Sequence, residues 1–288
     1  MEISVVVVTL GRTPLLQRCV RAIASGTLRP RELVVVDQGP PGLDPRLEEW
    51  LAGSAVALEH VDVPPMGVSR ARNIGAVAAA ADHLAFTDDD SVPDPEWLAA
   101  LAQAVEATPA DGASGRVLPL EDDRPGRIAV SSRTDMNARS FRGRGEAAPW
   151  EVGTGGNLLV RRTVFERVGG FDEEFGPGAR FRAAEDVELL ERLLRAGATL
   201  AYTPRAVVHH ETKTRSDRFK RRLPYGFGLG ALVARAARDR RSLLARRYLV
   251  MQARLTSAGL RSGSPRRTLE PVLSSLGFVA GFGAARKR

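Results

Sequence analysis

Unbroken apolar runs and helical apolar spacing alternate along the first half of the chain. Residues 3–9 and 33–36 are almost entirely aliphatic and β-branched, which is typical of parallel strands buried on both faces. The segment between them carries Leu15, Leu16, Cys19, Val20 and Ile23 at helical spacing. Thr13 is the expected N-cap of that helix, with Pro14 at its first position. The pattern predicts strand, helix, strand.

The same alternation continues downstream. We expect helices at 44–51 and 69–81 and strands at 56–61 and 84–87, followed by strands at 157–160 and 206–208 and a helix at 183–196 that ends before Gly197. This order predicts an α/β fold, a mostly parallel sheet flanked by helices with right-handed crossovers. Residues 121–149 are polar and rich in Arg, Gly and Pro, and predict a long surface loop that is mobile without ligand.

Charge divides the chain in two. From Thr203 onward there are 20 Lys and Arg against 4 Asp and Glu, whereas the preceding residues hold 22 basic and 30 acidic side chains. Helices are expected near 229–240, 242–255 and 269–285. We therefore predict an α/β domain over 1–215 and a basic helical C-terminal extension over 216–288. Two interpretations of the extension stay open: peripheral contact with an anionic membrane, or a helical cap that completes the core.

Composition narrows the cellular setting. The single cysteine, Cys19, excludes an internal disulfide and fits a reducing compartment. No secretory signal and no stretch of about 20 apolar residues is visible. A cytoplasmic protein is expected, and the membrane interpretation of the extension would place it on the cytoplasmic face. With 3 Trp and 3 Tyr, the chain offers few aromatic platforms for stacking bases, so no nucleic-acid partner is expected.

Three adjacent carboxylates, residues 88–90, follow the strand expected at 84–87. They repel one another, so they must face water or surround a cation. Thr9 and Asp37 end two other expected strands, and ligands of such sheets bind beyond the carboxyl ends of the strands. This convergence favours a divalent metal over a solvated acidic turn.

A second acidic pair, Glu185 and Asp186, begins an expected helix after a glycine-rich turn. Carboxylates at that position are also stabilised by the helix dipole alone, which is the alternative to a general base. His209 and His210 follow the strand expected at 206–208 and are candidates for metal or phosphate contact.

In this order, the motifs resemble glycosyltransferase family 2, the inverting enzymes with a GT-A fold. The resemblance is carried by residues 4–9 with Arg12, 34–37, 67–75 (G-x-x-x-A-R-N-x-G), 86–90 (D-x-D), 155–157 with 161–162 and 168–173, 185–189 with Arg192, and 202–206 with His210. It spans roughly residues 3–215.

The resemblance implies a hexosyltransferase-type enzyme of cell-envelope or polysaccharide biosynthesis. A UDP-, GDP- or dTDP-linked sugar would donate to a hydroxyl of a glycan, lipid-linked or small-molecule acceptor. Mn²⁺ or Mg²⁺ would lie between Asp88 and Asp90, with His210 as a further contact. Asp186 would be the general base, and Glu185 would position the acceptor. The implied nucleotide-sugar contacts are Thr9, Arg12, Asp37, Arg72, Asp88, Asp89, Gly156 and Asn157.

One position departs from the family pattern: Gln38 stands where a second acidic residue often follows the nucleotide-binding aspartate. No Q-x-x-R-W segment of processive synthases is visible, so a single transfer is expected. The alternatives are a sugar-phosphate nucleotidyltransferase, a non-enzymatic protein that binds nucleic acid or an anionic surface, and a sugar-binding protein without turnover. A nucleotidyltransferase would need a glycine-rich loop after the first strand, and residues 10–12 match such a loop poorly.

Overall fold

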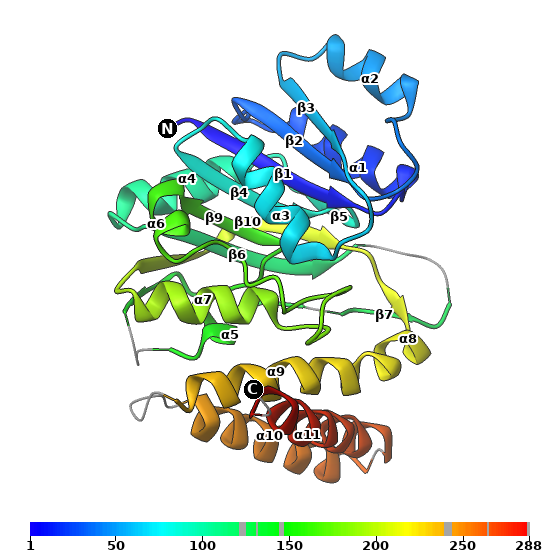
Figure 1. The fold of residues 1–288 in the computed structure, drawn as a ribbon, viewed down its shortest axis with the longest axis vertical. Coiled ribbons are helices and arrows are strands. Elements are labelled where there is room, and N and C mark those ends of the chain that lie inside the picture. The colour runs from blue at the N-terminus through cyan, green and yellow to red at the C-terminus, as the bar shows by residue number, and fades with distance from the viewer. Residues whose placement is uncertain (121–124, 131, 144–146, 239–243, 264, 287–288) are drawn as a thin grey trace.

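A nine-stranded mixed sheet forms the centre of the molecule (Figure 1). The computed structural model describes residues 1–120, 125–130, 132–143, 147–238, 244–263 and 265–286. The strand order is β3-β2-β1-β4-β9-β6-β10-β5, and β8 pairs with β10. The strands are β1 (Ile3–Thr9), β2 (Glu32–Asp37), β3 (Ala57–Asp62), β4 (His83–Asp88), β5 (Ser91–Pro93), β6 (Gly112–Pro119), β8 (Arg139–Arg142), β9 (Asn157–Arg161) and β10 (Thr199–His210).

The first four strands are parallel neighbours, as the alternating pattern predicts. The strand β9 runs antiparallel between β4 and β6, and β10 pairs in parallel with β6. The expected α/β class with a mostly parallel sheet is therefore confirmed. A second, two-stranded sheet joins β7 (Arg127–Ile128) to β11 (Lys213–Thr214).

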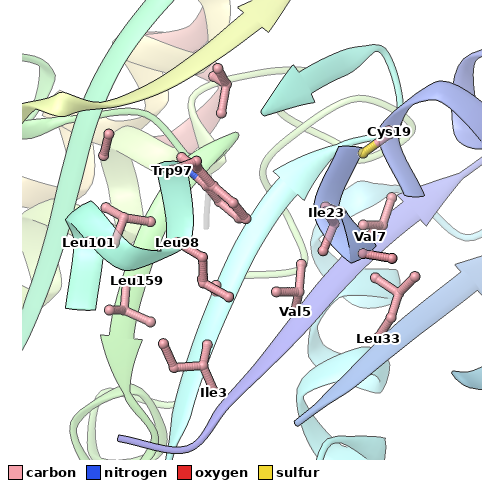
Figure 2. Close-up of a cluster of buried hydrophobic side chains, with 14 of the residues drawn as sticks. Ile3, Val5, Val7, Cys19, Ile23, Leu33, Trp97, Leu98, Leu101 and Leu159 are labelled. Carbon is pink, nitrogen blue, oxygen red and sulfur yellow. The ribbon is translucent and has the colours of Figure 1, made fainter. Parts of the chain in front are cut away.

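Helices cover both faces of the sheet. Successive residues of β1 point to opposite sides, so each face has its own apolar side chains to bury. Val5 and Val7 pack in the cluster of Figure 2, whereas Val6 and Val8 pack in a separate cluster. The first face is covered by α1 (Thr13–Ala24), α2 (Pro45–Ala52) and α4 (Trp97–Ala107). The second is covered by α3 (Val68–Ala78), α5 (Pro149–Val152), α6 (Arg162–Arg167) and α7 (Glu185–Arg195).

Two local expectations need correction. The N-cap of α1 is Arg12, not Thr13, so the helix takes in Thr13 and has Pro14 at its second position. The strand expected at 206–208 is the second half of the longer β10, whose register against β6 shifts between Thr203 and Val207. The polar interruption around Pro204 hid this continuity, because proline normally ends a strand.

The segment 121–149 is more structured than the expected loop. Residues 121–124, 131 and 144–146 lie outside the described residues. The remainder contains β7 and β8, and Arg133 lies 4.4 Å from the Tyr202 ring centroid and donates to the carbonyls of Trp150 and Glu151. The Tyr202 hydroxyl donates to the Asp135 carbonyl at 2.7 Å. These contacts fasten part of the segment to β10.

The C-terminal helices form a separate layer below α5 and α7 (Figure 1). They are α8 (Arg215–Lys220), α9 (Arg222–Ala236), α10 (Leu244–Arg261) and α11 (Pro265–Arg286). The expected tail helices overlap α9, α10 and α11, although residues 239–243 lie outside the described ranges. The division after residue 215 falls at the start of α8 and stays a prediction. Among the described helices, none combines the length and apolar character needed to cross a bilayer.

Glycines set the close packing of α9. A Cβ at Gly226 or Gly230 would lie 1.9–2.0 Å from a backbone carbonyl oxygen of α11. A Cβ at Gly228 would lie 2.4 Å from the carbonyl oxygen of Ala183, just before α7. This glycine spacing therefore serves helix packing, and it fixes α9 against the turn that precedes Glu185.

Candidate active site

The carboxyl ends of β1, β2 and β4 meet along one edge of the sheet, as the sequence predicts. Thr9 is in register with Asp37 on one side, and Asp88 is in register with Val8 on the other. The Asp37 carboxylate accepts hydrogen bonds from the backbone N–H groups of Gly11 (3.1 Å) and Gly39 (2.7 Å). These bonds hold the loops after β1 and β2 side by side.

Three of the predicted metal ligands come together. Candidate ligand atoms of Asp88, Asp90 and His210 all lie within 4.8 Å of one another. Antiparallel pairing of β5 with β10 places His210 opposite Ser91, next to Asp90. Because side chains alternate along a strand, His209 faces the other way and contacts Asp94 at 2.8 Å. Of the two adjacent histidines, only His210 belongs to this group.

The hydrogen bond of His210 suits it to metal binding. Its Nδ1 lies 2.8 Å from the Glu211 carbonyl oxygen, which can only accept, so Nδ1 carries the proton. Nε2 lies 3.4 Å from Asp90 Oδ1 and is the nitrogen left to bind a metal, which would take the place of a proton there. A carbonyl partner on the other ring nitrogen is the usual way in which proteins orient a metal-binding histidine.

Cations of the protein surround the aspartate triplet. Lys213 Nζ lies 2.9 Å from Asp90 Oδ2, and Arg12 forms an ion pair with the fully buried Asp89. Burial alone would raise the pKa of Asp90, but His210 and Lys213 outweigh it and lower that pKa. Sequence reasoning missed Lys213, although it is one of only three lysines in the chain.

Arg72 connects the two acidic groups. It is 3% exposed, with Nη2 2.6 Å from Asp88 Oδ1 and Nη1 3.6 Å from Glu185 Oε1. Burial opposes the charged form, but Asp88, Glu185 and Asp186 raise the pKa of Arg72. Among the described residues, its Nη1 has no hydrogen-bond partner. A buried, unpaired donor of this kind is rare and points to an oxygen of a ligand.

A glycine pair before β9 lets these groups converge. A Cβ at Gly156 would lie 2.4 Å from Asp88 Oδ2, and a Cβ at Gly155 would lie 2.9 Å from Arg72 Nη1 and 3.0 Å from Asp186 Cβ. The sequence motif 155–157 gave a site role to Gly156 but none to Gly155, whose N–H donates to Asp186 Oδ2 at 3.3 Å. Any larger side chain would separate the acidic groups.

Glu185 and Asp186 form a partly buried pair at the start of α7. Burial, reinforced by the neighbouring Asp186, raises the pKa of Glu185 to about 7. Burial also raises the pKa of Asp186, against hydrogen bonds from the N–H groups of Val187 and Gly155. The N-cap residue Ala184 has a φ of 71°, a left-handed conformation that is strained for alanine. A strained turn thus presents two carboxylates with raised proton affinity.

Three predicted contact residues turn inward instead. Asn157 is fully buried: its amide donates to the carbonyls of Arg116 (2.8 Å) and Ala206 (3.0 Å) and accepts from the Trp97 indole (2.9 Å). Thr9 is 1% exposed and donates to Asp89 at 2.6 Å. Asn157, Thr9 and Asp89 therefore brace the strand ends through bonds within the protein, and the donor contacts expected of them stay a prediction.

Tyr225 of α9 is a further residue that the sequence did not single out. Desolvation together with the negative charges of nearby Asp186 and Glu185 raises the pKa of its hydroxyl. The residue as a whole is 41% exposed. The first turn of α9 therefore borders the acidic pair and is open to solvent.

Gln38, where the family pattern often has an acid, accepts from the N–H groups of Met66 and Gly67 at 2.8 and 3.1 Å. It fastens the loop before α3 to the end of β2. This uncharged residue thus holds the loop that leads to Arg72.

Curated relatives share most of the α/β region. A glucosyl-dolichyl phosphate glucuronosyltransferase from Haloferax volcanii is 28% identical over 217 residues, 73% of this chain and 69% of that protein. An N-acetylglucosaminyl-diphospho-decaprenol L-rhamnosyltransferase from Mycobacterium tuberculosis is 29% identical over 243 residues, 73% of this chain and 76% of that protein. The chain spans 44% of a pre-mycofactocin glycosyltransferase from M. tuberculosis, at 31% identity.

Solved structures share this fold over nearly the whole chain. A mannosyltransferase from Pyrobaculum calidifontis, in complex with GDP-Man and Mn²⁺, has a TM-score of 0.67 at 19% identity and matches 97% of this chain and 86% of its own. S. aureus TarS 1-349 in complex with UDP has a TM-score of 0.60 at 14% identity, over 100% and 90%. The fold is therefore the expected GT-A fold.

The sequence profile described as glycosyl transferase family 2 matches residues 4–169, more than half of the chain. This match favours glycosyl transfer over the nucleotidyltransferase alternative, and the Asp88, Asp90 and His210 group supplies a D-x-D-like place for a metal. The chain belongs to glycosyl transferase family 2 and is a glycosyltransferase.

Proposed function

We propose that this enzyme is inverting and dependent on a divalent cation, and that it moves one sugar from a nucleotide-diphosphate-sugar to an acceptor hydroxyl. One observation carries the proposal: the Asp88, Asp90 and His210 group and the partly buried Glu185–Asp186 pair are joined by a single arginine, Arg72. Donor activation and proton removal would thus occur in adjacent parts of one site.

The donor set fits Mn²⁺ or Mg²⁺. Two carboxylates suit either hard cation, and the imidazole favours Mn²⁺. The bound cation would stabilise negative charge on the departing nucleotide diphosphate. Asp88, Asp90 and His210 would hold it, and the Gly156 backbone would leave room for Asp88.

Basic side chains next to these ligands would bind the donor. Arg72 has one nitrogen on Asp88 and one free of hydrogen bonds among the described residues, which suits an oxygen of the nucleotide-sugar. Arg12 is half exposed beside Asp89, and Lys213 lies on Asp90, so both are placed for the diphosphate. Asp37, at the end of β2, would contact the nucleoside.

Asp186 would be the general base. It would take the proton of the acceptor hydroxyl while that oxygen attacks the anomeric carbon and the bond to the diphosphate breaks on the opposite side, which gives inversion. Its raised pKa makes it a stronger base than an exposed aspartate. Glu185 and the Tyr225 hydroxyl, both next to Asp186, would position the acceptor.

The proposed acceptor class is based on the names of the relatives. Two of them are named for dolichyl phosphate-linked and decaprenol-linked sugars. We propose a polyprenol-linked acceptor and a role in cell-envelope or polysaccharide biosynthesis.

A thermal-shift screen tests this function. UDP-, GDP- and dTDP-sugars are each added with and without Mn²⁺, and we expect one donor class to raise the unfolding temperature only when Mn²⁺ is present. At a ligand concentration of about 100 Kd, binding adds about 2.7 kcal/mol to stability. An Asp90→Asn variant should lose the shift. If no donor class shifts the unfolding temperature with Mn²⁺, or if EDTA leaves the shift intact, the metal-dependent donor site is refuted.

A further inference from the structure

The C-terminal helix, α11, carries an apolar stripe that the protein does not cover. Leu269, Val272, Leu276 and Val279 are 49%, 42%, 58% and 70% exposed. They follow one another at intervals of three and four residues, so they lie on one face of the helix. A helix that only completed the core would turn such a stripe inward.

The neighbouring helix α10 has exposed apolar positions as well. Leu249 is 63% exposed and Leu260 is 64% exposed, and a spacing of eleven residues places both on one face. The two helices are joined by Tyr248 and Phe278, whose rings stack with centroids 4.1 Å apart. Both helices lie in the layer farthest from the sheet (Figure 1).

The charge on this layer has one sign. Between residues 244 and 286 the sequence contains Arg246, Arg247, Arg254, Arg261, Arg266, Arg267 and Arg286, and Glu270 is its one acidic residue. Glu270 is held by Arg218 at 3.0 Å and Arg222 at 2.7 Å, from α8 and α9. It therefore faces the inner helices. Among the described side chains, Arg246, Arg254, Arg261 and Arg286 are exposed, so the surface of this layer is basic and apolar.

A pocket at the edge of the layer adds to this basic character. It has a volume of about 650 Å³ between α5 and α10 and is lined by Arg246, Arg247 and Arg254 together with apolar side chains, among them Trp150 and Val250. Glu151 also lines it, 4.0 Å from Arg247, so the arginines outnumber the acid. Such a lining suits a group that is both anionic and amphipathic.

We propose that the outer face of α10 and α11 docks on an anionic lipid bilayer, with both helices lying in the plane of the interface. Exposed leucine and valine would enter the boundary of the acyl chains, while the arginines contact lipid phosphates. A second copy of the chain fits less well, because a symmetric contact would bring the same arginines face to face. Charge complementarity selects the bilayer.

Docking would also orient the active site, although the docking itself does not depend on the proposed function. The first turn of α9 borders Glu185 and Asp186 through Tyr225, and the same helix packs closely on α11. The acceptor side of the site would then lie near the membrane surface, where a lipid-linked hydroxyl could reach it.

Vesicle flotation tests the proposal. The full chain is mixed with vesicles of phosphatidylcholine alone or of phosphatidylcholine with phosphatidylglycerol, and we expect flotation only with the anionic vesicles and a loss of flotation at high salt. The double variant Leu276→Glu/Val279→Glu should bind about tenfold or more weakly. Val77→Glu is the matched control: Val77 is 84% exposed but belongs to α3, and this variant should float like the wild type.

Three outcomes would overturn the proposal. The first is no flotation with anionic vesicles at low salt, and the second is flotation of the double variant equal to that of the wild type. The third is a stable wild-type dimer that the double variant converts to a monomer, which would make the face a contact between copies. Leu260→Glu tests α10 independently: if the double variant does not fold, equal flotation of Leu260→Glu and the wild type refutes docking through this face.

Discussion

Replacing Asp186 with asparagine separates catalysis from stability at this site. Asparagine keeps the size of the side chain and an oxygen for the Val187 N–H, which Asp186 Oδ1 accepts at 2.7 Å. It cannot take a proton from an acceptor hydroxyl. We therefore expect turnover to fall by about 10²–10⁴-fold. Donor binding should persist, because Asp186 is not among the residues that would hold the metal.

The same change should stabilise the protein. Burial and the charge of Asp186 raise the pKa of Glu185 from 4.5 to about 7. Removing that charge relieves the repulsion, which should return on the order of 1 kcal/mol when Glu185 is ionised. For a protein of this size, that corresponds to about 3 °C in unfolding temperature.

The raised pKa of Glu185 also sets the direction in which stability changes with pH. Because the pKa of Glu185 is higher in the folded state, the folded protein binds this proton more tightly than the unfolded chain does. The wild type therefore loses stability as the pH rises from about 4.5 to about 7. The asparagine variant should be more stable than the wild type above this range and equal to it below.

Two measurements follow. Release of nucleotide diphosphate gives the rate, with the donor that the thermal-shift screen selects, and differential scanning fluorimetry at several pH values gives the stability. Glu185→Gln is the matched control, with a similar gain in stability and a smaller loss of rate. Near-normal turnover of Asp186→Asn would refute the general-base role, and a variant that is less stable at alkaline pH would refute the repulsion argument.

Three further changes test other parts of the site. Lys213→Met removes the ammonium 2.9 Å from Asp90. The Mn²⁺ affinity, measured by electron paramagnetic resonance, should therefore rise about tenfold, while the donor affinity should fall. Unchanged affinities would show that Lys213 has no role in the site. Asn157→Ala leaves three buried polar groups unpaired and should cost about 3 kcal/mol in urea denaturation; a loss under about 1 kcal/mol would contradict its bracing role. Gly156→Ala should displace Asp88 and weaken Mn²⁺ binding about tenfold or more. Wild-type Mn²⁺ affinity in this variant would show that the site adjusts to the added methyl group and does not require Gly156.

The fold was largely predictable because its strands are strongly patterned. Residues 3–9 and 33–36 became β1 and β2, and Asp44 caps α2 by accepting from the Arg46 N–H. No element was predicted over α4 or β6, and the other elements missed were short or interrupted, such as the three residues of β5 and the first half of β10. Too few side chains define a period in such pieces, and long-range pairing decides them.

The site was predictable in its acidic residues but not in their partners. The sequence marks Asp88, Asp90 and Asp186, because adjacent carboxylates are unusual, but it does not tell which way a polar side chain points. Asn157 and Asp89 were expected to contact the donor, yet both are fully buried and bonded within the protein. The roles of Gly155 and Tyr225 depend on contacts between segments far apart in the chain.

The pairing of charges indicates how a donor could enter without a large electrostatic cost. Each aspartate of the triplet already has a cationic partner: Arg72 on Asp88, Arg12 on Asp89, and Lys213 on Asp90. A nucleotide diphosphate with one divalent cation brings charges that nearly cancel, so the total charge of the site would change little. Binding would then exchange partners, with the cation taking the carboxylates and the released basic side chains taking the diphosphate. Affinities for donor and metal should therefore be strongly coupled, each ligand binding weakly without the other.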